Sequence, residues 1–155
     1  MEAPARAAPE DSVGRLQVAA EAYLVEQANE YRDPQLAAAS LSFEGCTLRY
    51  SFRRDFPSLV VQLPGVDLKT INPRSVSVGE ARIEFGTFGE RNSIEYREAL
   101  DGSEITHALV SSVQIRLAEV PGPVRAQMRT TFRKLLRLCN AKASHDPLAP
   151  AARSR

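Results

Sequence analysis

The spacing of apolar residues along the chain changes from helical to alternating and then back to helical. Near the start, apolar residues recur at helical intervals, and the side-chain oxygens of Asp11 and Ser12 suit a helix N-cap. Pro34 ends the pattern, because proline disfavours helix in the residue before it. We therefore predict a helix over residues 12–32, whose thin, alanine-rich stripe favours packing on a sheet edge or on a partner. That stripe consists of Val13, Leu16, Ala20, Tyr23, Leu24, Gln27 and Tyr31.

Between residues 41 and 117 apolar and polar side chains alternate, which is typical of strands with one buried face. A polar opposite face favours antiparallel pairing. The Asp101-Gly102 pair and residues 89–92 suit hairpin connections, so successive hairpins predict a meander. The longest alternation predicts a buried face made of Ile105, His107, Leu109, Ser111, Val113, Ile115 and Leu117.

The first strand changes parity within its own length. Leu41 and Phe43 are odd-numbered, whereas the next apolar residues, from Cys46 to Phe52, are even-numbered. A β-bulge adds one residue and shifts the register in this way. We therefore predict a bulge at Glu44 and Gly45.

The strongest helical stripe lies near the end of the chain and predicts a helix over residues 122–141. It consists of Val124, Met128, Phe132, Leu135, Leu136 and Cys139. Together these patterns predict a single α+β domain over residues 11–142. Its core would be an antiparallel β-meander, or a partly closed barrel or sandwich, with an N-terminal helix and a C-terminal amphipathic capping helix. Residues 1–10 and 143–155 lack the apolar content to fold, so we expect disordered tails there.

Composition fits this size and adds an expected location. The chain has 155 residues, 43% of them hydrophobic, which is enough for one core. No apolar run approaches the roughly 20 residues that cross a bilayer as a helix, so we expect no transmembrane segment. The start lacks the basic and apolar regions of a signal peptide, which predicts a cytoplasmic protein. An exported protein whose leader had been removed would begin in the same way, so a periplasmic or secreted setting stays open.

Basic side chains gather on the polar side of the last predicted helix. Arg125, Arg129, Arg133 and Arg137 recur every four residues, with Lys134 and Lys142 nearby. One interpretation is a binding surface for an acidic protein or an anionic lipid. Nucleic acid is disfavoured by a pI near 7.8 and by the lack of interleaved aromatics. The alternative, which we favour, is that the stripe is solvated or is paired within the chain with acids in residues 10–33: Glu10, Asp11, Glu21, Glu26, Glu30 and Asp33.

The cysteines and histidines offer few candidates for chemistry. Two cysteines, Cys46 and Cys139, are too few for a zinc site, and we predict two buried thiols, with a disulfide between them as the alternative. His107 could act as a general base with Cys46 or Ser111, but a lone histidine on an apolar strand face is more often a core residue. We therefore expect no metal, no cofactor and no catalytic residue.

The element order, antiparallel strands followed by one amphipathic helix, resembles the pleckstrin-homology-like barrel over roughly residues 41–141. The helix lacks the tryptophan that many members of that superfamily carry. The segments FEGCTL at residues 43–48 and LRLC at residues 136–139 also resemble the flanks of short bacterial proteins without an assigned activity. The resemblance implies a small binding module and brings no active site.

The sequence thus favours a small, non-catalytic binding or interaction module. Two alternatives remain. One is peripheral binding to an anionic membrane through the basic C-terminal helix, and the other is a small enzyme that uses His107.

Overall fold

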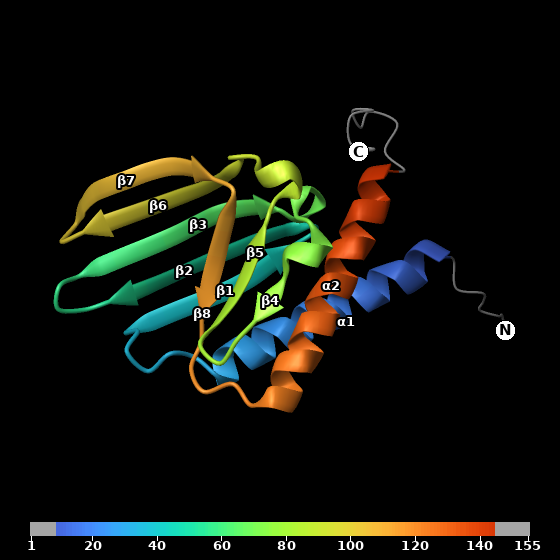
Figure 1. The fold of residues 1–155 in the computed structure, drawn as a ribbon, viewed down its shortest axis with the longest axis horizontal. Coiled ribbons are helices and arrows are strands. Elements are labelled where there is room, and N and C mark those ends of the chain that lie inside the picture. The colour runs from blue at the N-terminus through green and yellow to red at the C-terminus, as the bar shows by residue number, and fades with distance from the viewer. Residues whose placement is uncertain (1–8, 145–155) are drawn as a thin grey trace, which may run out of the picture.

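The computed structural model describes the backbone of residues 9–144 and the side chains of residues 12–141 (Figure 1). Along the chain, one helix precedes eight strands and a second helix follows them. Short 3-10 turns lie at Leu68–Thr70, Pro73–Ser75 and Phe88–Glu90. The helices are α1 (Pro9–Glu30) and α2 (Gly122–Ser144). The strands are β1 (Ala38–Glu44), β2 (Thr47–Arg54), β3 (Leu59–Asp67), β4 (Ser77–Val78), β5 (Arg82–Gly86), β6 (Ile94–Leu100), β7 (Ser103–Val110) and β8 (Ser112–Arg116).

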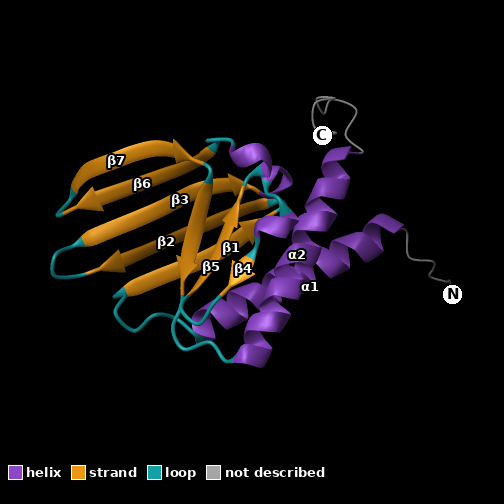
Figure 2. Cartoon of the chain, viewed as in Figure 1, coloured by secondary structure: helices purple, strands orange, loops and turns teal. Residues whose placement is uncertain are grey.

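The strands form two antiparallel sheets that do not close into a barrel. The large sheet has five strands in the order β1-β2-β3-β6-β7, and the small sheet has three in the order β4-β5-β8. The strands of the small sheet cross those of the large one, and both helices lie together at one end of the sheets (Figure 2). The predicted α+β class is confirmed. The two helices extend slightly into the expected tails, and the rest of those tails lies outside the described residues.

The parity change in the first strand comes from a hairpin, so the bulge predicted at Glu44 and Gly45 is wrong. The strand ends at Glu44, and β2 returns beside it with Glu44 opposite Thr47. Gly45 has a positive φ of 62°, which glycine adopts without steric cost. A tight turn reverses side-chain parity just as a bulge does, so the alternation alone could not separate them.

A second connection also differs from its prediction. Residues 89–92 do not close a hairpin, because β5 pairs with β4 and β8, whereas β6 pairs with β3 and β7. The connection instead carries the chain from the small sheet to the large one. The other predicted turn is confirmed: β6 and β7 form a hairpin through Asp101 and Gly102, with Leu100 opposite Ser103.

The long alternation of residues 105–117 is split between the two sheets. The chain leaves the large sheet at Val110 and enters the small sheet at Ser112. In β8, Ile115 is buried as predicted. In β7, however, Leu109 is exposed, so the prediction that Ile105, His107 and Leu109 are buried is wrong. At Ser111 the chain passes from the large sheet to the small one. Odd-numbered residues therefore face outward in β7 and inward in β8.

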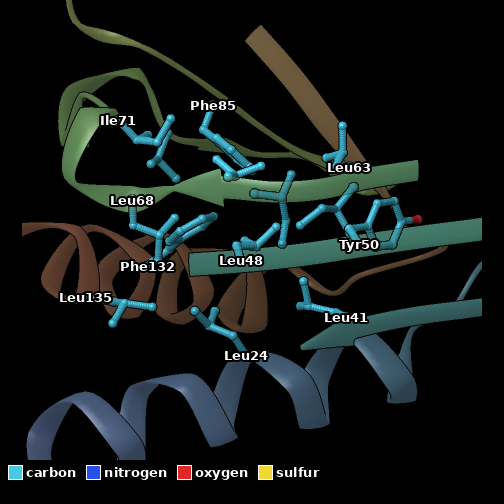
Figure 3. Packing of buried hydrophobic residues seen from close by; sticks show 14 of the residues in the cluster. Leu24, Leu41, Leu48, Tyr50, Leu63, Leu68, Ile71, Phe85, Phe132 and Leu135 are labelled. Carbon is cyan, nitrogen blue, oxygen red and sulfur yellow. The ribbon is translucent and has the colours of Figure 1, made fainter. Parts of the chain in front are cut away.

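The C-terminal helix supplies one wall of the core, as its stripe predicted (Figure 3). Phe132 packs edge-on against Phe85 with ring centroids 5.2 Å apart. Leu24 brings α1 into the same cluster, and α1 packs against α2 and β1. Each fully buried side chain of this size contributes about 1.5–3 kcal/mol through burial. The buried residues of the α2 stripe are Met128, Phe132, Leu135, Leu136 and Cys139, and Val124 is partly buried.

Candidate functional site

A cleft of about 550 Å³ lies between the two sheets. In a strand, side chains two residues apart lie on the same face. Tyr50 and Phe52 of β2, and Val61 and Leu63 of β3, therefore face the cleft together. The small sheet provides the opposite wall. The apolar lining includes Phe52, Val61 and Leu63 from the large sheet, Val110 at the end of β7, and Val113 and Leu117 in and after β8.

One side of this cleft carries an ion pair. Arg116 Nη2 lies 2.7 Å from Asp33 Oδ2, and the guanidinium sits 5.4 Å from the centroid of the Phe52 ring. Asp33 is only 8% exposed, and its Oδ1 also accepts a hydrogen bond of 2.9 Å from the Gln35 backbone N–H. A buried carboxylate needs such partners to offset its lost hydration. The pair therefore places a guanidinium, already held in position, on the wall of the cleft.

Tyr50 adds a hydroxyl beside Arg116. Its oxygen accepts a hydrogen bond of 3.2 Å from the Arg116 backbone N–H. Burial raises the pKa of Tyr50, so the hydroxyl keeps its proton at neutral pH. That proton has no acceptor among the side chains and backbone of the described residues. Tyr50 and Arg116 can therefore both donate to an oxygen atom of a bound molecule.

His107 lies away from this cleft, on the solvent face of β7. Its Nε2 is 2.8 Å from Glu95 Oε2, and its Nδ1 is 3.5 Å from Glu104 Oε2. Cys46 offers it no thiol, because that residue is bonded to Cys139. The histidine thus sits in an exposed charge cluster with two carboxylates.

The basic stripe of α2 runs along the small sheet. Arg125 Nη1 lies 3.8 Å from Glu80 Oε2, and Arg133 Nη2 donates a hydrogen bond of 3.0 Å to the Val76 carbonyl. These two partners flank β4, the edge strand of the small sheet. Within residues 12–141 no ion pair joins an α2 arginine to an acid of α1, so the expected pairing with the first helix is not seen there. Of the remaining candidates, Arg129 is half-buried, and Lys134 and Arg137 are exposed.

The two cysteines form a disulfide, so the prediction of two free thiols is wrong. The Cα atoms of Cys46 and Cys139 lie 5.8 Å apart, and the bond ties α2 to the turn between β1 and β2. Gln17 of α1 also holds this turn, through a hydrogen bond of 3.0 Å to the Gly45 carbonyl. Both helices are thereby attached to one hairpin turn.

Sequence reasoning missed the residues that line the cleft. The sequence placed Asp33 only among the acids expected to neutralise the arginine stripe, and nothing in it singled out Arg116. An arginine and an aspartate 83 residues apart give no local signal that they pair. The alternation of residues 105–117 continues through Ser111, where the chain changes sheets, so it gave no hint of the cleft either.

The described residues contain neither a membrane-spanning helix nor a cluster of metal-binding side chains. No described helix is long and apolar enough to span a membrane. Within the described residues, no group of three or more histidine, cysteine, aspartate or glutamate side chains could hold a metal ion. The chain matched no protein-family model, no curated protein and no solved structure.

Proposed function

We propose that this protein is a non-catalytic binding domain whose cleft takes a largely apolar molecule with one oxygen-bearing end. The observation that carries the proposal is the cleft itself, with apolar walls from both sheets and two adjacent donors, Tyr50 and Arg116. Small-molecule sites typically measure about 300–1,000 Å³ and combine apolar walls with a few placed polar groups. The cleft has that size and that chemistry.

The polar side of the cleft favours an acceptor oxygen in the ligand. Arg116 provides donors beyond the one that Asp33 occupies, since a guanidinium carries five N–H groups. Arg82 lies opposite Arg116 in the strand register and also lines the cleft. A carboxylate at the end of an aliphatic chain would place its oxygens at these donors and its chain against Phe52 and Val61.

The disulfide supports a setting outside the cytoplasm. Disulfides persist in oxidising compartments and are rare where thiols are kept reduced. Cys46 and Cys139 are paired with each other, and no free cysteine remains in the chain. A periplasmic or secreted binding domain therefore fits the structure better than the cytoplasmic setting expected from the sequence.

Titration with a fluorescent fatty acid, dansyl-undecanoic acid, tests the proposal. We expect saturable binding with a blue-shifted, enhanced emission. Val113→Trp fills the cleft and should weaken binding by about tenfold or more, equivalent to about 1.4 kcal/mol. Val60→Trp is the matched control, because Val60 is half-buried on the outer face of the large sheet and does not line the cleft.

Circular dichroism should show that both variants keep the fold. Equal binding by the two tryptophan variants, or no saturable binding by the unaltered protein, would contradict the proposal.

A further inference from the structure

Three of the four sheet edges in this protein have other parts of the chain packed beside them or bonded near them. The β1 edge is flanked by α1, and the β4 edge receives the Arg133 side chain at the Val76 carbonyl. At β8, the Arg116 N–H donates to Tyr50, and just beyond the strand the Ala118 N–H donates 2.8 Å to the Tyr31 carbonyl. The fourth edge is β7, which ends the large sheet (Figure 1). Among the described elements, only β6 packs extensively against it.

The β7 edge lacks most of the features that keep edge strands apart. Natural edges are usually protected by lysine, proline, bulges or a covering element. The register between β6 and β7 shifts at Ile105, which has no partner on β6. From Thr106 to Val110 the pairing is regular. Those five residues, Thr-His-Ala-Leu-Val, include no lysine, arginine, carboxylate or proline. Leu109 is 60% exposed on the outer face, and Ile105 is 53% exposed.

We propose that β7 pairs with β7 of a second copy of this chain, antiparallel and about a two-fold axis at Ala108. A two-fold interface brings the same surface of each copy together, so the strand must be complementary to itself. With Ala108 opposite its equivalent, His107 faces Leu109 of the second copy and Thr106 faces Val110 of the second copy. No charge faces a like charge in this register, and the two alanines leave room for the backbones to approach.

The regular segment determines this choice of axis. Thr106 to Val110 has Ala108 at its midpoint, whereas an axis at His107 would bring the unpaired Ile105 into the new ladder. Pairing would cover Leu109 and join the two large sheets into one continuous sheet. Because Val110 lines the cleft, the second copy would also lie beside that wall of each cleft. The pairing itself does not depend on what the cleft binds.

Sedimentation velocity of the full chain, from low micromolar to several hundred micromolar, tests the association. We expect a shift from the 17.0 kDa chain toward twice that mass. Leu109→Lys should weaken dimerisation by about tenfold or more, because it places a charge in the ladder. Val18→Lys is the control: Val18 is 63% exposed on α1, and its substitution should leave the association unchanged.

A chain that stays monomeric throughout, or a Leu109→Lys variant that dimerises as well as the unaltered protein, would overturn the proposal. The register has its own test. Ala108→Cys should form a disulfide between copies on mild oxidation, identified by mass spectrometry as a peptide joined to itself, whereas Ser42→Cys on β1 should not. Equal cross-linking of both variants would refute the β7 pairing. An added peptide of residues 103–112, which copies β7, should compete with the second copy and shift the dimer toward monomer.

Discussion

The Arg116–Asp33 ion pair is the residue-scale feature on which the candidate site most depends. It is partly enclosed, since Asp33 is nearly buried and Arg116 lies over Phe52. Exposed ion pairs contribute little to stability, but removing one member of an enclosed pair leaves the other charge without compensation. The same pair therefore stabilises the fold and holds the guanidinium at the cleft.

Asp33→Asn should lower the free energy of unfolding by about 1–3 kcal/mol, because Arg116 would lose its charged partner. Denaturation with urea measures the change. Asp55→Asn is the control, since Asp55 pairs with Arg53 at 3.3 Å with both side chains about half exposed. We expect that control to change stability by no more than about 0.5 kcal/mol. Equal effects of the two substitutions would contradict the enclosed character of the Arg116 pair.

The Glu95–His107 contact predicts a pH effect on the outer face of the sheet. The hydrogen bond from His107 lowers the pKa of Glu95, and nearby Arg97 lowers it further. A carboxyl whose pKa is lower in the folded state adds stability above its unfolded pKa and loses it as the pH falls through the folded pKa. An NMR titration should find that His107→Ala raises the pKa of Glu95, while Leu109→Ala does not. An unchanged Glu95 titration in His107→Ala would show that the histidine is not its partner.

At the scale of elements, the disulfide makes the β1–β2 turn and α2 one unit. It closes a loop with a sequence separation of 93 residues. Cross-linking a long loop restricts the unfolded chain, so reduction should lower the free energy of unfolding by about 2–5 kcal/mol. Guanidinium denaturation with and without dithiothreitol measures this loss. Cys46→Ala should reproduce the loss and be insensitive to the reductant; a variant as stable as the oxidised protein would refute the role of the tether.

The sequence predicted those elements whose pattern is local. The α2 stripe, the helix before Pro34 and the Asp101-Gly102 turn each depend on neighbouring residues, and each is confirmed. The division of strands between two sheets could not be predicted in the same way. A single residue, Ser111, separates β7 from β8, and an unbroken alternation runs through it although the inward face changes.

The candidate site was harder to predict for the same reason. Its polar part joins Asp33, just after α1, to Arg116 at the end of β8, and its apolar part takes side chains from both sheets. Such a cleft exists only once the sheets are placed against each other. The arginine stripe, in contrast, was evident in the sequence. One of its members, Arg133, donates a hydrogen bond within the fold to the Val76 carbonyl, next to β4.

At the scale of the whole molecule, the hydrophobic core and the cleft lie in different places. The helices cover one end and build the core with Leu48, Leu68 and Phe85, as Figure 3 shows. Away from the helices, the sheets enclose the cleft, and the large sheet ends in the uncovered strand β7. The proposed binding function rests on the open cleft, and the disulfide tethers the opposite, helical end of the molecule.

Methyl-selective NMR during titration with undecanoic acid tests the central claim most directly. We expect saturable shifts in the methyl groups of Val61, Val110 and Val113, which line the cleft. Val60 on the outer face and Val18 on α1 should not move. Shifts confined to residues outside the cleft, or no shifts at saturating ligand, would contradict the assignment of the inter-sheet cleft as the binding site.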